Sequence, residues 1–234
     1  MNILVCIKQV PDTTEIKIDP VKNTLIRDGV PSIVNPFDTY ALESAARIKD
    51  NNPDAKIVVV TMGPPQAEKA LRECLAIAAD KAYLVTDRKF GGSDTLATSY
   101  VLRKTVEKLE GLEGKFDAIF CGKQAIDGDT GQVGPELAEW LDIPQVTNCW
   151  EVEVAGDSMK AKKQTDEGFE IIGVKMPCLI TYTQPAWEVR TPNIKRKLAS
   201  NKAEVPQISV ANLADVEEVR LGLNGSPTKV KSTA

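Results

Sequence analysis

The chain has 234 residues, of which 42% are hydrophobic and 26% are charged, as in an ordinary soluble globular protein. This length suffices for one large α/β domain with an appendage. The formal net charge of -4 argues against nucleic acid as the main partner, because nucleic acid binds basic surfaces. The sequence shows no apolar stretch of bilayer length and no basic start of a signal peptide, so we expect a cytoplasmic protein without membrane insertion.

Histidine is absent, which removes Ser-His-Asp catalysis, Cys-His catalysis and every imidazole metal ligand. The cysteines form no Cys-x-x-Cys pair and most of them lie in apolar patterns, so we expect reduced, buried thiols and no metal site. They are Cys6, Cys74, Cys121, Cys149 and Cys178. With no catalytic residue in evidence, any redox chemistry must come from a bound cofactor.

Strand-like and helix-like segments alternate from the N-terminus. Apolar runs predict strands at 3–10, 57–61, 82–86 and 118–121, and an irregular excursion at 11–36 carries a small exposed strand at 15–19. Helical spacing predicts a helix capped by Asp38, a helix over 67–75, a helix capped by Ser93 or Asp94, and a helix that starts near Pro135. This order predicts an α/β fold: a parallel twisted sheet with helices on both faces, of the adenine-nucleotide-binding, Rossmann-like type.

The pattern changes after Pro144. Antiparallel strands that extend or cap the sheet are predicted at 149–155, 159–163, 168–174 and 179–183. A basic arm with little pattern follows at 185–206, and residues 222–234 look unstructured. We therefore divide the chain into an α/β domain with an antiparallel extension (1–184) and an extended C-terminal arm (185–234). A solvated surface loop is the alternative for the basic run, whereas an arm and tail of this kind suit a subunit that wraps around a partner.

The segment 116–137 is the most informative about function. A buried strand at 118–121 breaks at Gly122 into a loop rich in Gly, Asp and Thr, and a helix follows. At the carboxyl end of a parallel strand, free backbone N–H groups and the helix dipole favour a phosphate, and Gly122, Gly128 and Gly131 permit close ligand approach. The loop matches neither the Walker pattern nor the usual dinucleotide fingerprint. An ordinary strand–helix connection is the alternative.

Several motifs of the chain are together similar to those of the β subunit of electron transfer flavoprotein, and the resemblance covers essentially the whole chain. They are Val5 to Asp12, Asn35 to Asp38, Met62 to Pro64, Gly122 to Asp127 and the arm Arg190 to Lys197. The resemblance implies a heterodimer with an α subunit that holds one FAD. It also implies a nucleotide site in the β subunit, which holds AMP in the respiratory branch and a second FAD in the NADH-oxidising, electron-bifurcating branch.

Two loops resemble the bifurcating branch. Respiratory members usually read Ile-Asp-Asp-Asp and then an Asn-Gln-Thr-Gly type of loop, whereas this chain reads Asp-Gly-Asp-Thr-Gly-Gln-Val at 127–133. The loop at 87–98, with Phe-Gly-Gly-Ser-Asp-Thr, is again similar to that branch. Gly128 removes a side chain and a charge where an anionic diphosphate must pass, and Gly91 with Gly92 opens room for the isoalloxazine and a nicotinamide ring. Lineage drift without a change of ligand is the alternative.

Carried over position by position, the resemblance implies three groups of cofactor contacts. The residues bordering the adenosine part are Cys6, Lys8, Asn35, Phe37, Asp38, Met62 and Gly63. The residues around the phosphates are Gly122, Gln124, Asp127, Gly128, Asp129, Thr130, Gly131, Gln132 and Val133, of which Asp129 and Thr130 are expected to contact ribose and phosphate. The residues approaching the flavin ring, where NADH docks, are Phe90, Gly91, Gly92, Asp94 and Thr95. Structural alternatives exist: Cys6 and Met62 as core residues, and Asp38 as a helix cap only.

The arm at 190–197 resembles the recognition loop that family members insert into a partner dehydrogenase. The partner-binding residues implied are Arg190, Ile194, Lys195 and Arg196, with Ile194 as an apolar anchor surrounded by steering charges. The sequence departs from the family at 198–200, where Leu-Ala-Ser replaces a more basic continuation. We therefore expect the details of partner recognition to differ.

The resemblance as a whole implies a β subunit that binds FAD, takes hydride from NADH and divides the electrons. One electron goes to ferredoxin or flavodoxin and the other, through the α-subunit FAD, to an acyl-CoA-type dehydrogenase, as in anaerobic metabolism. The single chain is then an electron-carrier subunit, and only the complex is an NADH-dependent flavin oxidoreductase. Two alternatives remain: a non-bifurcating β subunit that binds AMP structurally, and a free-standing adenine-nucleotide sensor of similar fold.

Overall fold

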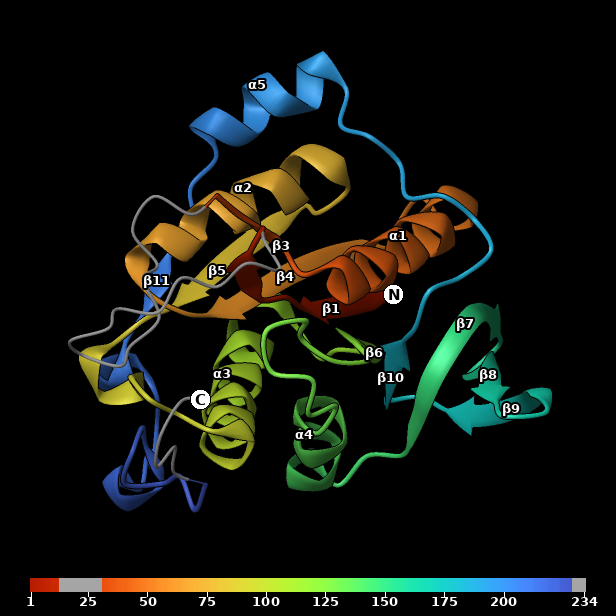
Figure 1. The fold of residues 1–234 in the computed structure, drawn as a ribbon. Helices are drawn as coiled ribbons and strands as arrows, with labels where there is room; N and C mark the ends of the chain where they lie inside the picture. The colour runs from red at the N-terminus through yellow and green to blue at the C-terminus, as the bar shows by residue number, and fades with distance from the viewer. Residues whose placement is uncertain (13–30, 229–234) are drawn as a thin grey trace.

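The computed structural model describes residues 1–12 and 31–228 (Figure 1). Within these residues, nine strands form one mixed sheet in the order β11-β5-β4-β1-β6-β10-β7-β8-β9. Their bounds are β1 Asn2–Cys6, β4 Lys56–Met62, β5 Lys81–Val85, β6 Ala118–Gly122, β7 Gln145–Ala155, β8 Ser158–Thr165, β9 Gly168–Lys175, β10 Cys178–Tyr182 and β11 Gln207–Ile208. Two short strands, β2 (Gln9–Pro11) and β3 (Ser32–Val34), form a separate antiparallel pair.

Helices cover both faces of the sheet, which confirms the predicted α/β fold (Figure 1). Their bounds are α1 Pro36–Asn51, α2 Glu68–Ile77, α3 Thr95–Glu113, α4 Val133–Leu141 and α5 Ile194–Lys202. Alternation along β1 explains the two layers: Ile3 and Val5 pack in one core with α1 and α2, whereas Leu4 and Cys6 pack in the other with α3 and α4. In the described ranges, no helix combines the length and the apolar character needed to cross a bilayer.

The topology of the parallel strands marks one edge of the sheet as the place where a ligand crevice is expected. β5, β4, β1, β6 and β10 run parallel, so their carboxyl ends share that edge. The chain steps outward from β1 to β4 and β5, then returns through α3 to β6 on the opposite side of β1. In α/β proteins such a reversal marks the crevice at the carboxyl ends of the two central strands, where ligands bind. Here the loops after β1 and β6 border it.

Strands β7, β8 and β9 form an antiparallel ribbon that continues from the sheet beside β10. One face of the ribbon is buried, because Met159, Ala161 and Val174 belong to the same core as α1 and α2. The other face carries charged side chains on β7 and β8 and the exposed apolar side chains of Phe169 and Ile171 on β9. This arrangement confirms the predicted antiparallel extension for three of its four strands.

Two strand predictions are wrong in detail. The strand predicted at 3–10 divides near Lys8, because the Lys8 N–H donates to Asp38 and its carbonyl accepts from the Asn35 N–H, so that β2 leaves the sheet. The strand predicted at 179–183 as antiparallel is parallel to both β6 and β7. All five residues of β10 are buried, which is typical of a central parallel strand. The strand predicted at 15–19 lies outside the described residues.

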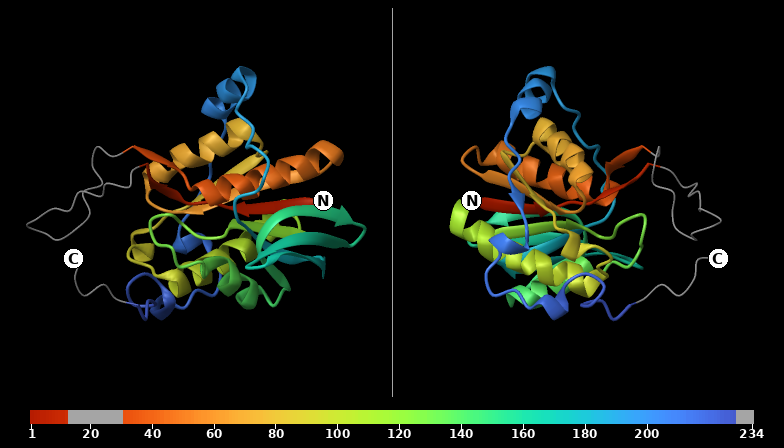
Figure 2. Two further views of the ribbon diagram at one scale, coloured as in Figure 1. Left: turned by 45° about the vertical axis from the view of Figure 1, so that its right-hand side comes forward. Right: turned by 90° about the vertical axis from the view of Figure 1, so that its left-hand side faces the viewer.

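The basic arm contains a helix that the sequence pattern did not predict. α5 is the outermost helix and packs over α2 (Figures 1 and 2). Arg196 of α5 donates to the carbonyl of Ala79 (2.9 Å) just past the end of α2, and Arg72 of α2 donates to the carbonyl of Ser200 (2.7 Å) near the end of α5. Each helix end thus accepts hydrogen bonds from an arginine of the other helix. Apolar periodicity could not reveal a helix held by such polar contacts.

We expect two helix glycines to respond in opposite ways to alanine. Gly111 lies on the exposed side of α3, and a Cβ there would meet nothing within 4 Å. Gly111→Ala should raise the free energy of unfolding by up to about 1 kcal/mol, because alanine is the better helix former. A Cβ at Gly134 in α4 would lie 2.6 Å from the buried Thr181 side chain on β10. Gly134→Ala should therefore lower the free energy of unfolding by about 1–3 kcal/mol.

Urea unfolding followed by circular dichroism measures both changes. A Gly134→Ala protein as stable as the parent, or more stable, would contradict the close packing of α4 on β10.

Candidate functional site

The loops after β1 and β6 are joined across the crevice. The ammonium Nζ of Lys8 lies 2.6 Å from the carboxylate of Asp127, in an ion pair at the rim. The buried side chain of Asn35, just before α1, donates from Nδ2 to the carbonyl of Gln124 (2.8 Å) and accepts at Oδ1 from the Ile126 N–H (3.1 Å). Both atoms of this one amide therefore fix the loop that follows β6.

Asp38 joins the ends of the two central strands. Its buried carboxylate accepts from the N–H of Lys8 (2.6 Å) and from the N–H of Gly122 (3.1 Å). The alternative role as a helix cap is wrong, because α1 begins at Pro36 and Asp38 lies inside it. A Cβ at Gly122 would overlap the Asp38 carboxylate, which explains the glycine at this position. Burial raises the pKa of Asp38 to about 7, although its hydrogen bonds act in the opposite direction.

Hydrogen bonds hold the loop after β6 as a turn, and this turn leaves space beside Gly128. The N–H groups of Gly128 and Asp129 both donate to the carbonyl of Ala125, at 3.1 and 2.8 Å. Asp129 has a φ of 51° and Gly131 a φ of 64°, and Gln124 Nε2 donates to the Asp129 carboxylate (2.6 Å). A Cβ at Gly128 would meet nothing within 4 Å, so the loop leaves space at that residue.

α4 starts directly behind this loop. Gln132 occupies its N-cap position without a capping hydrogen bond from its side chain, and Val133 is the first helical residue. Thr130 and Gln132 are exposed. The first N–H groups of such a helix and its dipole favour an anion. The structure therefore brings a Gly-rich turn and a helix N-terminus together, as the sequence predicts.

The loop at 87–98 is connected by hydrogen bonds to the region of the loop after β6. Asp94 caps α3, as predicted, by accepting from the Ala97 N–H (3.0 Å), and it also accepts from the N–H of Thr228 (3.0 Å). Thr95 Oγ1 donates to the carboxylate of Glu136 in α4 (3.0 Å). The N-termini of α3 and α4 thus lie together, and the two loops belong to one region.

The C-terminal segment at 222–228, expected to be unstructured, packs against this second loop. Gly92 has a φ of 75°, and Leu223 carbons lie 2.6 Å from where its Cβ would be. Ser226 Oγ accepts from the Asp94 N–H at 2.8 Å. Glycine at position 92 is therefore required by the packing of the C-terminal segment.

The other predicted cofactor residues lie along the same carboxyl edge. Cys6 and Phe90 are buried, Phe37, Met62, Gly63 and Val133 are partly buried, and Gly91 is exposed. Cys6 is paired in register with Cys121, and this neighbour together with burial raises the pKa of the Cys121 thiol. Phe90 packs in the core with α3, so its ring has a structural role. All five cysteines are buried and free, as predicted.

Glu136 was missed at the sequence level. Its Oε1 accepts from Thr95, and in the described part of the chain its buried Oε2 has no hydrogen-bond partner. Burial raises the pKa of Glu136. An acidic residue in the first turn of a helix is common, so the sequence carried no signal for this position.

The arm is fixed to the body by two of its predicted partner-binding residues. Arg190 makes ion pairs with the buried carboxylate of Glu43 (2.7 Å) and with Asp50 (2.7 Å), both on α1. These contacts raise the pKa of Arg190 and lower the pKa of Asp50. Arg196 is likewise bonded to the end of α2. Both arginines therefore position the arm in this chain.

The remaining residues of the arm face outward on α5. Ile194 is 80% exposed, Leu198 one turn later is 61% exposed, and Lys195 is exposed. Two apolar side chains thus share one side of a basic helix. Leu198, one of the residues at which the sequence departs from the family pattern, thus joins Ile194 on the exposed side of α5.

Comparison with known proteins gives a consistent result. Residues 22–213 match the family described as Electron transfer flavoprotein domain. The chain is 54% identical to the electron transfer flavoprotein subunit beta of Thermoanaerobacterium thermosaccharolyticum, over 100% of this chain and 88% of that relative. It is 50% identical to the subunit of the same name from Megasphaera elsdenii, over 99% and 86%. It is also 46% identical to the caffeyl-CoA reductase-Etf complex subunit CarD of Acetobacterium woodii, over 98% and 86%.

We expect Asp38 to make stability depend on pH. The folded pKa is about 7, whereas an aspartate in the unfolded chain titrates near 4. As pH rises, the unfolded state loses this proton first, so the free energy of unfolding falls between about pH 4 and 7 and levels off above. Asp38→Asn removes the titrating group and should remove this part of the slope. Urea unfolding at a series of pH values measures how the free energy of unfolding depends on pH in both proteins.

Asp50→Asn serves as the contrasting variant. Because the folded pKa of Asp50 is lowered, its stabilising contribution is present above the unfolded pKa and is lost only as pH falls. An unchanged slope between about pH 4 and 7 in Asp38→Asn would show that Asp38 is not the group that titrates there.

Proposed function

The chain belongs to the electron transfer flavoprotein family, and we propose that it is the β subunit of an electron-bifurcating member. In this role it binds FAD, accepts hydride from NADH, and passes electrons to ferredoxin or flavodoxin and, through the α-subunit FAD, to an acyl-CoA-type dehydrogenase. β subunits of this family pair with α subunits. The observation that carries the proposal is the loop Asp127 to Gln132, with its open space at Gly128.

The loop and α4 fit the diphosphate of a dinucleotide. The first N–H groups of α4 have no side-chain cap from Gln132 and favour an anion. Gly128 leaves space without a charge beside that helix end, where an aspartate would repel a phosphate. Asp129, held by its positive φ, and the exposed Thr130 would provide the contacts to ribose and phosphate.

Asn35 and Asp38 affect the ligand indirectly, because they fix the strand ends and the loop that follows β6. Both amide atoms of Asn35 and both carboxylate oxygens of Asp38 are already bonded to backbone groups of the chain. Their role in this proposal is to hold the crevice in shape before a ligand enters. Lys8 at the rim, paired with Asp127, adds a cation near the expected phosphates.

When bound, FAD supplies the hydride acceptance and one-electron transfer that the side chains of this chain cannot perform. The residues at 90–95 are expected beside the flavin ring. They are connected to the phosphate loop and to α4, because Thr95 Oγ1 donates to the carboxylate of Glu136 and lies 3.5 Å from Oε1 of Gln132. The protein therefore orients one end of the cofactor relative to the other. In this proposal the side chains bind and orient the cofactor, and no acid–base step is assigned to any of them.

α5 is the proposed contact with the dehydrogenase. Ile194 and Leu198 form an exposed apolar pair on a helix that also carries Lys195 and Lys197. Charges around a small apolar anchor speed encounter and suit a transient complex. The name of the relative CarD refers to a complex with a caffeyl-CoA reductase, which supports a CoA-ester enzyme as the partner class.

A second candidate function uses the same crevice for AMP. In a non-bifurcating β subunit, AMP supports the fold and electrons pass through the α-subunit FAD alone. The N-terminus of α4 serves an AMP phosphate equally well. The two candidates differ in what occupies the space beside Gly128 and next to residues 90–95.

Gly128→Asp tests the assignment of the phosphate loop. A Cβ at this position meets nothing within 4 Å, so the variant should retain the fold. The added charge opposes the diphosphate, and the affinity of the flavin-depleted heterodimer for FAD should fall about tenfold or more. Gly128→Asn has the same size without the charge and should change the affinity much less. Fluorescence titration with FAD measures all three proteins, and equal affinities would contradict the assignment.

NADH tests hydride acceptance directly. Under anaerobic conditions, NADH should bleach the visible flavin absorbance of the parent heterodimer within the mixing time of a stopped-flow experiment. The Gly128→Asp protein should bleach less, in proportion to the FAD it has lost. Dithionite sets the full extent of bleaching in each sample. Bleaching by dithionite and none by NADH would favour the AMP-binding candidate.

A further inference from the structure

Residues 213–228, which we call the strap, are fastened to the body of the molecule by buried and stacked side chains. The strap lies beside α3, on the other side of the molecule from β7, β8 and β9 (Figures 1 and 2). Leu213 and Leu221 are buried in the core that α3 and α4 share. The guanidinium of Arg220 lies 5.4 Å from the centre of the Trp140 ring on α4. The strap is therefore an ordered part of the fold.

The strap and the loop at 87–95 are shaped for close contact. Gly222 of the strap has a φ of 52°, and a Cβ there would overlap the carbonyl oxygen of Lys89 in the loop. In the other direction, a Cβ at Gly92 of the loop would overlap Leu223 of the strap. Each of the two segments thus has a glycine where the other approaches, and their relative position is fixed by backbone packing.

One buried hydroxyl connects the strap, the loop and the start of α3. Ser226 is 2% exposed, and its Oγ accepts from the N–H of Asp94 (2.8 Å). The same Oγ donates to the carbonyl of Gly222 (2.7 Å) and lies 3.4 Å from the carbonyl of Gly92. Removal of this hydroxyl would leave the Asp94 N–H without its acceptor, at the residue that caps α3.

Every polar group of Asp94 is bonded within the chain. Its two carboxylate oxygens accept from the N–H of Ala97 and from the N–H of Thr228 in the strap, both at 3.0 Å. Its N–H donates to Ser226, and its carbonyl accepts from the Thr98 N–H (3.0 Å). Asp94, expected beside the flavin ring, is thus bonded as a residue that holds the loop on the strap and on α3.

The strap fixes a different part of the proposed site from the residues that fix the phosphate loop. The loop after β6 is held by Asn35 and by its own hydrogen bonds, whereas the loop at 87–95 is held by the strap. In the proposed function, a ligand reaches the loop at 87–95 only if it extends beyond the phosphates. FAD does so, whereas AMP ends at its phosphate. The strap therefore bears on the flavin half of FAD alone.

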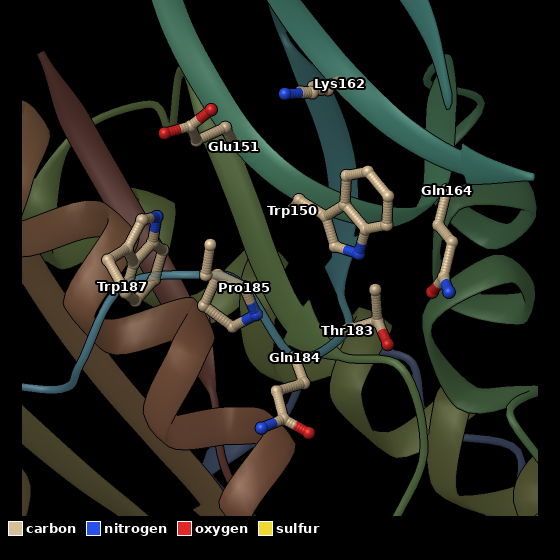
Figure 3. Close-up of a pocket in the computed structure, with 9 residues that line it drawn as sticks. Trp150, Glu151, Lys162, Gln164, Thr183, Gln184, Pro185 and Trp187 are labelled. Carbon is tan, nitrogen blue, oxygen red and sulfur yellow. The ribbon is translucent and has the colours of Figure 1, made fainter. Parts of the chain in front are cut away.

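An open pocket elsewhere in the molecule offers a competing place for an aromatic ring. It has a volume of about 540 Å³ and is lined by Trp150 of β7 and by Trp187 in the segment that follows β10 (Figure 3). Its lining residues come from β7, β8 and 183–187, and include neither the strap nor the loop at 87–95. A variant of Trp150 can therefore be compared with a variant of the strap.

We propose that the strap, through Ser226 and Asp94, determines the preference of this chain for FAD over AMP. By fixing the loop at 87–95 on the start of α3, the strap keeps the place of the flavin half in shape before the cofactor enters. Ser226 is in this view a positioning residue that touches no ligand. The inference rests on the proposed function, because it concerns the half of FAD that AMP lacks.

Ser226→Ala tests the strap in the full heterodimer, with the α-subunit FAD in place and the nucleotide of this subunit removed. The dissociation constant for FAD should rise about fivefold or more, because the loop loses the hydrogen bond that fixes it. The dissociation constant for AMP should change by less than about twofold. Ser200→Ala removes a hydroxyl that is also buried, on α5, and should change neither constant. Isothermal titration calorimetry measures both ligands in each protein.

Hydrogen exchange reports on the loop itself. Without added nucleotide, the backbone amides at 90–98 should exchange faster in Ser226→Ala than in the parent, and in Ser200→Ala they should exchange as in the parent. Saturating FAD should restore protection at these amides in Ser226→Ala, whereas AMP should not. Equal exchange at 90–98 in Ser226→Ala and the parent would overturn the proposal, because the strap would then not hold the loop.

The affinities give three further outcomes. Equal losses of affinity for FAD and AMP in Ser226→Ala, or no loss for either, would overturn the proposal. A loss of FAD affinity in Trp150→Ala and none in Ser226→Ala would also overturn it and assign the flavin to the pocket of Figure 3. A parent heterodimer that binds AMP and takes up no FAD at this site would contradict the proposed function itself, whereas a parent that binds FAD as tightly as Ser226→Ala does would contradict the role of the strap alone.

Discussion

Two polar side chains at the start of α1 hold the carboxyl ends of β1 and β6 together, and the ligand crevice depends on them. Asp38 accepts backbone hydrogen bonds from both strand ends, and Asn35 bonds the loop after β6 through both atoms of its amide. The hydrogen bond between Asp38 and the N–H of residue 122 requires glycine at that position, because a side chain there would overlap the Asp38 carboxylate. The positions of the Gly-rich turn and of the first turn of α4 are thereby set by the protein itself, before a cofactor binds.

Much of this arrangement could be predicted from residue patterns. Buried β-branched runs marked the parallel strands, Asp94 was recognised as a cap, and the loop after β6 stood out because glycines and aspartates follow a strand and precede a helix. Features that depend on contacts between distant segments could not be predicted from these patterns. α5 is held by arginine–carbonyl bonds, β10 is parallel because the ribbon returns the chain to the centre of the sheet, and Glu136 is notable only because α3 meets α4. Local sequence does not encode such contacts between distant segments.

Two regions of different chemistry serve two roles in the proposed subunit. The loops at the carboxyl ends of β1 and β6 are polar and rich in glycine, whereas α5 is basic and carries one exposed apolar pair. The arm that carries α5 is anchored on α1, because Arg190 pairs with the buried carboxylate of Glu43, which also accepts from Arg47.

In the proposed subunit, the crevice between β1 and β6 holds a complete flavin dinucleotide. The most direct measurement is the identity and amount of the nucleotides released from the purified heterodimer, separated by chromatography and identified by mass. We expect a second FAD for each heterodimer and no AMP. A single FAD accompanied by an equal amount of AMP would contradict it.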